Sequence, residues 1–163
     1  MKLFDSIFKR NNRKFDYPLS QYNRIVVDKP KHRIGNKEFK KLVNENLKPQ
    51  LKELEFEGED YFYYRLRNNN IETVLLGTSP YGKAICINVE IKKGNGTVLK
   101  VSEIENMVSI SETALGWKRL SPDKKDCWWW FRPTVDENKI VFEEMFKLIS
   151  TEGEKYFLKL NKN

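Results

Sequence analysis

The chain has 163 residues, of which 30 are Lys or Arg, 23 are Asp or Glu and one is His, so its formal net charge is +7. This length suits one domain with or without a tail. One His and two Cys are too few for a standard structural zinc site, and the longest apolar run, residues 127–131, is far too short to span a bilayer. We therefore expect no metal, no cofactor and no transmembrane segment.

The positive charge is concentrated near the N-terminus. Residues 1–35 hold nine Lys or Arg and three Asp, whereas residues 36–163 hold 21 basic and 20 acidic side chains. We predict a basic N-terminal arm or linker over 1–35 and a single, nearly neutral domain over 36–163. Nucleic-acid binding needs clustered positive charge, so it would involve the arm.

The first ten residues combine an apolar face with basic neighbours. Leu3, Phe4, Ile7 and Phe8 share one face at helical spacing. This pattern indicates weak contact with a membrane surface or, as the favoured alternative, a tail helix that docks on its own domain. Asp5 and Ser6 interrupt any signal-peptide core. Together with two cysteines that lack disulfide-framework spacing, this predicts a cytoplasmic protein.

The predicted elements begin with a helix over 36–55, because apolar residues recur there every three or four positions. Pro49 lies inside it and predicts a kink or a restart of the helix near residues 46–48. Strands follow at 61–67, 71–78 and 84–92, with a hairpin turn at Asn68 to Asn70. On the third strand Ile85, Ile87, Val89 and Ile91 alternate with polar residues, which indicates one buried face.

The rest of the chain is less regular. Residues 97–125 are ambiguous; the pattern indicates a short helix at 102–109 and an extended stretch at 113–120. Residues 127–131 read as a strand, and helices are predicted at 136–150 and 154–160. The order predicts an α+β fold: an antiparallel sheet of about four strands, a meander plus one later strand, with N- and C-terminal helices packed on one face.

Familiar catalytic motifs are absent from the sequence. The single His32 lies in the arm, and no nucleophile elbow, Walker loop or dinucleotide fingerprint occurs. Cys86 and Cys127 fall in predicted strands, which favours structural thiols. These observations favour a non-enzymatic protein.

The candidate binding residues lie on the face of the sheet opposite the helices. Alternation assigns the polar set to that face, namely Tyr61, Tyr63, Arg65 and Arg67 on the first strand and Asn88 and Glu90 on the third. Tyr and Arg carry much of the binding energy at protein interfaces. The plainer interpretation is cross-strand pairing of an arginine with Glu72 or Glu90 on a solvated face.

Two further clusters are aromatic. In the run 128–131, alternation places Trp128 and Trp130 on one side, where exposure would make them an interface or a stacking platform. Burial of both sides of this run under other parts of the chain is an equally favoured alternative. Residues 117–119, Trp-Lys-Arg, are typical of a cation–π cluster or of a domain edge.

Several of these segments together resemble the domain of unknown function 4304 family. They are the helix 39–54 with its internal proline, Phe56, the strand 61–67, Asn88, Trp-Lys-Arg-Leu at 117–120, and Asp-Cys-Trp-Trp at 126–129. Glu55 departs from the family, where glycine is expected. The resemblance implies a small bacterial cytoplasmic α+β domain without assigned catalytic residues, in a group suspected of immunity or accessory roles beside toxins.

Three functions remain open on the sequence. The leading hypothesis is a protein-binding module, immunity-like or accessory to a toxin system, whose partner is neutral or acidic because complementary charge speeds association. The alternative is nucleic-acid binding through the basic arm and an aromatic sheet face. The third is an enzyme that uses Glu90 with Tyr63 or Arg65, which requires a pocket joining them.

Overall fold

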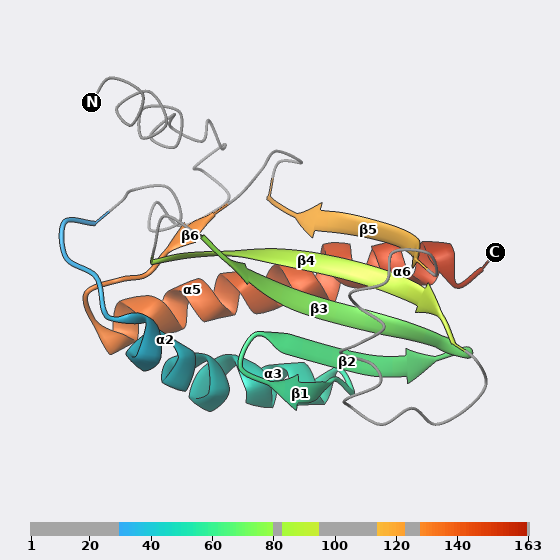
Figure 1. Ribbon diagram of the computed structural model, residues 1–163, viewed down its shortest axis with the longest axis horizontal. Helices are drawn as coiled ribbons and strands as arrows, with labels where there is room; N and C mark the ends of the chain where they lie inside the picture. Colours follow the sequence, from blue (N-terminus) through green and yellow to red (C-terminus); the bar gives the residue numbers. More distant parts are fainter. Residues whose placement is uncertain (1–29, 80–82, 95–113, 123–127, 163) are drawn as a thin grey trace, which may run out of the picture.

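The computed structural model describes residues 30–79, 83–94, 114–122 and 128–162, which form one antiparallel sheet with helices on one face (Figure 1). The strands are β1 (Glu57–Glu59), β2 (Phe62–Arg67), β3 (Asn70–Thr78), β4 (Ala84–Lys93), β5 (Ala114–Leu120) and β6 (Trp129–Trp130). The sheet order is β1-β2-β3-β4-β5, and β6 pairs with the start of β4. The predicted α+β class is confirmed, with six strands instead of about four because β1 and β5 also pair.

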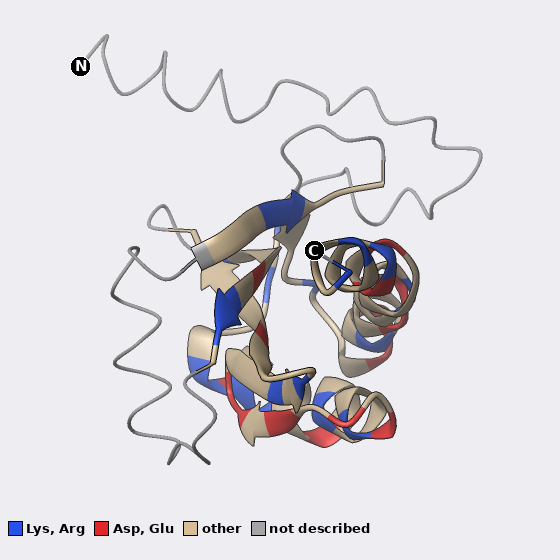
Figure 2. Ribbon diagram, turned by 90° about the vertical axis from the view of Figure 1, so that its right-hand side faces the viewer, with Lys and Arg blue, Asp and Glu red and all other residues tan. Residues whose placement is uncertain are grey.

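Two irregular helical segments cover the same side of this sheet (Figure 2). The first comprises α2 (Asn36–Leu42), the π-helical turn η2 (Val43–Leu47) and α3 (Lys48–Glu53), and the second comprises α5 (Val135–Leu148), the π-helical turn η4 (Ile149–Gly153) and α6 (Glu154–Leu160). Pro49 lies in the first turn of α3 and has no amide hydrogen to donate. The wider turn directly before it accommodates this loss, so the irregularity predicted near residues 46–48 is confirmed.

The end of α3 places Glu55 in a left-handed conformation, with φ at 64°. Its backbone N–H donates to the carbonyl of Lys52 at 2.9 Å, as expected just after a helix C-terminus. Glycine is the preferred residue at such a position because it has no Cβ to clash. Glu55 therefore has a strained backbone conformation at a position that favours glycine.

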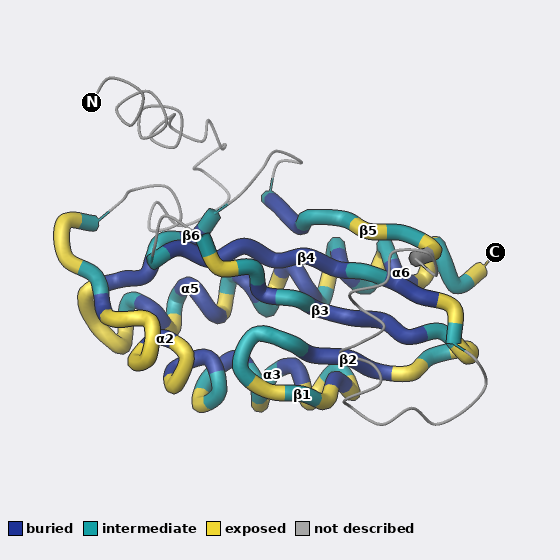
Figure 3. Tube along the Cα trace, viewed as in Figure 1, coloured by how far each residue is buried: buried dark blue, intermediate teal, exposed yellow. Residues whose placement is uncertain are grey.

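The side of the third strand that faces the helices is buried as predicted. The opposite side is buried as well, because Cys86 is 1%, Asn88 7% and Lys92 0% exposed, so the prediction that only one face of this strand is buried is wrong. Ile85, Ile87, Val89 and Ile91 are fully buried and belong to the main hydrophobic core. They pack with helix residues such as Phe39, whose ring stacks on that of Phe131 with centroids 3.6 Å apart. Figure 3 shows that β3 and β4 are buried along most of their length.

The hairpin between β2 and β3 is the tight turn that the sequence predicts. Asn68 and Asn69 form the two-residue loop, with φ angles of 53° and 61°. Two successive positive φ angles are the requirement of a type I′ turn, and asparagine tolerates them better than most residues. Gly94 approaches this loop closely, and its N–H donates to the Asn69 carbonyl at 2.8 Å.

Some sequence predictions fall outside the described residues: most of the 1–35 arm, including the helix at 1–10, as well as the helix at 102–109 and Cys127. Within the described ranges, none of the helices has both the length and the apolar character needed to cross a membrane.

Candidate binding site at the β5 edge of the sheet

The predicted site residues divide between the two faces of the sheet. Tyr63 pairs with Val74, which pairs with Val89, so Tyr63 points to the helices and is fully buried in the core. By strand alternation Tyr61, Arg65 and Arg67 point the same way. The predicted orientation of 61–67 is therefore wrong: these four residues lie on the covered face, and Phe62, Tyr64 and Leu66 lie on the other.

A buried ion cluster explains this reversal. Arg65 is 6% exposed, and its Nε donates to Glu72 Oε2 at 2.6 Å. Its two terminal nitrogens donate to the Leu54 carbonyl at 2.6 Å and to the Glu154 carboxylate. The guanidinium also lies over the Phe56 ring, 4.2 Å from the centroid. The three nitrogens of the Arg65 guanidinium group thus all have hydrogen-bond partners on the covered side of the sheet.

The acidic partner Glu72 is fully buried. Arg67 Nη2 lies 3.2 Å from its carboxylate and 2.8 Å from that of Glu154, and the Asn161 side-chain amide donates to its other oxygen. Removal from water raises the pKa of Glu72 to about 7, although Arg67 and Asn161 lower it in part. The predicted pairing of an arginine with Glu72 exists, but it fastens α6 to the sheet and does not face solvent.

The remaining predicted residues lie on the face of the sheet opposite the described helices. Asn88 and Glu90 alternate with the core residues of β4, and Trp130 pairs with Ala84 on the same side. Arg119 Nε donates to Asn88 Oδ1 at 3.1 Å, and its guanidinium carbon lies 5.1 Å from the Trp128 ring. Glu90 and the pair Tyr63 and Arg65 therefore lie on opposite faces of the sheet. The pocket that an enzyme using these three residues would require does not form.

Trp117 is the functional candidate that the sequence prediction left out of the site. It is 57% exposed on β5, and the Arg119 guanidinium lies 6.0 Å from its ring. The Arg119 guanidinium thus lies near the rings of both Trp117 and Trp128. The spacing of residues 117–119 indicated a cation–π cluster, but only the pairing of β4 with β5 brings it beside Asn88.

Strand β5 forms one edge of the sheet. Among the described strands only β4 pairs with it. Leu115 and Trp117 are about half exposed, whereas Leu120 at its end is fully buried. Its polar residues are the cations Lys118 and Arg119. The opposite edge, β1, carries the acidic residues Glu57 and Glu59 instead, so the two edges differ in charge.

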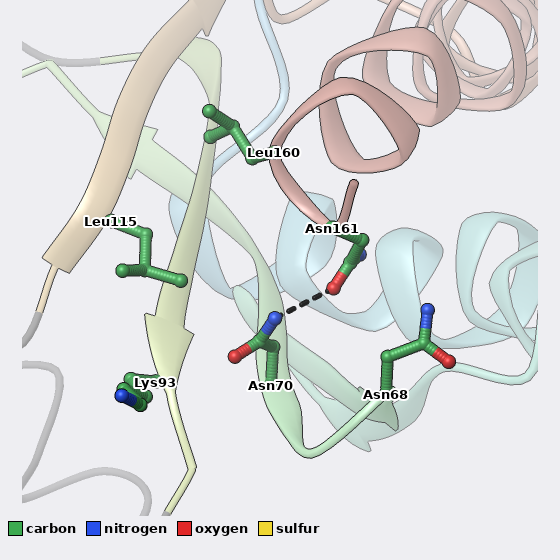
Figure 4. Close-up of a pocket in the computed structure, with 6 residues that line it drawn as sticks. All are labelled: Asn68, Asn70, Lys93, Leu115, Leu160 and Asn161. Carbon is green, nitrogen blue, oxygen red and sulfur yellow. Dashed lines mark hydrogen bonds between the residues drawn. The ribbon is translucent and has the colours of Figure 1, made fainter. Parts of the chain in front are cut away.

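A cavity of about 390 Å³ lies where β5 begins (Figure 4). It opens between β5, the β2–β3 turn and the end of α6. The Asn70 side-chain amide donates to Asn161 Oδ1 at 2.7 Å across its floor. Its lining residues are Asn68, Asn70, Lys93, Leu115, Leu160 and Asn161.

No family model, curated protein or solved structure matches the chain. Within the part of the chain that the structure describes, no group of three or more His, Cys, Asp and Glu could hold a metal ion.

Proposed function

We propose that this protein binds another protein by adding an extended, acidic segment of its partner to the edge of strand β5. The observation that carries the proposal is the exposure of Trp117 on this edge strand. Main-chain hydrogen bonds to an open strand supply affinity in such complexes, and side chains on alternate positions supply specificity.

The side chains of β5 supply an anchor. Tryptophan is among the residues most enriched at the energetic centres of protein interfaces, and Arg119 lies within cation–π distance of both Trp117 and Trp128. The hydrogen bond from Arg119 to Asn88 holds the guanidinium in place before a partner arrives. A held side chain loses less conformational entropy on binding.

The charges of the two edge strands indicate which kind of partner binds and at which edge of the sheet it binds. Lys118 and Arg119 attract an acidic strand to β5, whereas Glu57 and Glu59 repel it from β1. This fits a neutral or acidic partner. The resemblance to the domain of unknown function 4304 family supports a bacterial cytoplasmic setting, with an immunity-like or toxin-accessory role as one form of this activity.

The test uses a designed peptide, dye-labelled Thr-Glu-Glu-Val-Thr-Val-Leu with a C-terminal amide, and measures fluorescence anisotropy. In an antiparallel alignment its glutamates lie opposite Arg119 and Lys118, and its first valine lies opposite Trp117. We expect binding that weakens with salt and is lost when both glutamates are replaced by lysine. Trp117→Ala should weaken it about tenfold or more. Val135→Ala, an exposed apolar residue on α5, is the matched control.

Backbone pairing is tested by N-methylation. The amides of a strand point alternately to its two sides, so methylating one alternate set removes the donors that face β5 and methylating the other set does not. One methylated peptide should lose binding and the other should keep it. Equal behaviour of the two, or no binding at low salt, would overturn the proposal.

Nucleic-acid binding is the second candidate, because an arginine near two tryptophans also resembles a stacking platform for unpaired bases. The same assay with a labelled oligothymidylate separates the two. Salt-sensitive oligonucleotide binding that Trp117→Ala abolishes, without peptide binding, would assign the surface to nucleic acid.

A further inference from the structure

The side chains of β5 alternate between the two faces of the sheet. Trp117 and Arg119 lie on the face opposite the helices. Lys118 pairs with the core residue Val89 and therefore points toward α6. Its Nζ lies 5.8 Å from the centroid of the Tyr156 ring, and Figure 1 shows α6 beside the start of β5. A strand added at this edge would thus present one row of its side chains to the indoles and the other row to α6.

Gly116 brings the hydroxyl group of Tyr156 into the row that faces α6. Because Gly116 pairs with the core residue Ile91, a side chain at this position would point toward the helix. A Cβ here would overlap the Tyr156 hydroxyl oxygen and would lie 2.6 Å from Leu160 Cδ1. The phenol of α6 therefore occupies the place of a β5 side chain, next to Lys118 in the same row.

Lys118 and Tyr156 each carry a hydrogen-bond donor. Among the residues that the structure describes, no carboxylate pairs with Lys118 Nζ and no acceptor is hydrogen-bonded to the Tyr156 hydroxyl. Burial and the nearby Glu90 carboxylate raise the pKa of Tyr156, so its hydroxyl keeps its proton at neutral pH. An ammonium and a hydroxyl in one row match a carboxylate, because its two oxygens can each accept a hydrogen bond.

We infer that the partner segment places an acidic side chain on the α6 side of the added strand, where Lys118 and the Tyr156 hydroxyl bind its carboxylate together. The residue opposite Lys118 lies directly beside it, and the position of Gly116 is its diagonal neighbour, within reach of a long side chain such as glutamate. This inference rests on the proposed strand addition and adds Tyr156, a residue outside the edge strand, as a determinant of specificity.

The experiment uses the full chain and the same dye-labelled peptide amide, Thr-Glu-Glu-Val-Thr-Val-Leu, whose third residue lies opposite Lys118. Replacing this glutamate by glutamine should weaken binding about tenfold, as expected for a hydrogen bond to a charged group. Tyr156→Phe removes only the hydroxyl. It should reduce the preference for glutamate about threefold or more and leave the affinity for the glutamine peptide nearly unchanged. Lys118→Gln should also reduce the preference.

Two controls accompany these variants. Tyr61→Phe alters a half-buried tyrosine next to β2, which β3 and β4 separate from β5, and should change neither affinity. The second residue of the peptide lies opposite Arg119, on the other face of the sheet. Replacing that glutamate by glutamine should weaken binding to the unaltered protein and to Tyr156→Phe by the same factor.

The outcomes separate this inference from strand addition. Equal affinity for glutamate and glutamine at the third residue would overturn it, as would a preference that Tyr156→Phe leaves intact. An equal loss of affinity for both peptides in Tyr156→Phe would show a merely structural role and would also overturn it. Any of these results, with the difference between the two methylated peptides retained, would leave strand addition standing. Absence of binding by all the peptides would overturn both proposals.

Discussion

Replacing Arg65 by methionine should destabilise the fold severely. The change removes the cation that pairs with Glu72 and Glu154 and leaves the Leu54 carbonyl without its donor. Breaking a buried ion pair by removing one partner typically costs about 3–5 kcal/mol, because an uncompensated charge stays out of water. For a chain of this size that corresponds to a fall in melting temperature of roughly 10 °C or more.

The measurement is urea denaturation followed by circular dichroism at pH 8 and at pH 5. The cost should be smaller at pH 5, where Glu72 retains its proton and no longer needs a cation. Adding Glu72→Gln to Arg65→Met should recover part of the lost free energy of unfolding, because the two sites share one interaction.

The matched control is Lys40→Met. Lys40 pairs with Asp60 where both side chains are substantially exposed, and such pairs contribute less than about 1 kcal/mol. A cost for Arg65→Met as small as that of Lys40→Met, or one that Glu72→Gln does not reduce, would refute the assignment of the cluster as buried and coupled.

Three further predictions follow from particular residues. Burial raises the pKa of Glu72 from 4.5 to about 7, so the folded protein binds a proton more tightly than the unfolded chain. The free energy of unfolding should therefore fall, by at most about 3 kcal/mol, as pH rises from 4.5 to 7, and denaturation of Glu72→Gln should lack this fall. Glu55→Gly should raise the melting temperature slightly, by relieving a left-handed φ worth about 1 kcal/mol. Gly94→Ala should cost about 1–3 kcal/mol in urea denaturation, because its Cβ would lie 2.2 Å from the Asn69 carbonyl oxygen. Gly35→Ala meets no atom within 4 Å and should cost less than about 1 kcal/mol, which reflects only the lower preference for alanine at the N-cap of α2.

The pattern of β4 was predictable because it is strong and local. Four β-branched residues on alternate positions have one compatible arrangement, with Ile85 to Ile91 under the helices. Pro49 likewise identifies a break in the first helix from its own chemistry. The asparagines of the β2–β3 turn tolerate the conformation that a two-residue hairpin needs.

The orientation of β2 could not be read in this way. Phe62, Tyr64 and Leu66 form an apolar set, so local hydropathy places them inside. What reverses the strand is the pairing of Arg65 with Glu154, 89 residues away in the chain. A charged side chain can be buried in the core only when the fold brings oppositely charged partners to it. The periodicity of a single sequence does not show such partners when they are far away in the chain.

The residues of the candidate site could be recognised in the sequence, but their arrangement in space could not. Tryptophan, lysine and arginine at 117–119 stand out by composition, and both tryptophans near Arg119 were singled out in the sequence. Their meeting with Asn88 depends on the β4–β5 register and on its shift between Ile91 and Lys92. The cavity at Leu115 is lined by four segments that are far apart in sequence.

The short, acidic β1 limits what the sheet can build. A sheet that can add strands at both edges can polymerise. The glutamates of the edge strand β1 disfavour the pairing of another copy of the chain at that edge. The proposed addition of a partner strand at β5 would therefore stop after one strand. Complexes of this protein should have a one-to-one stoichiometry.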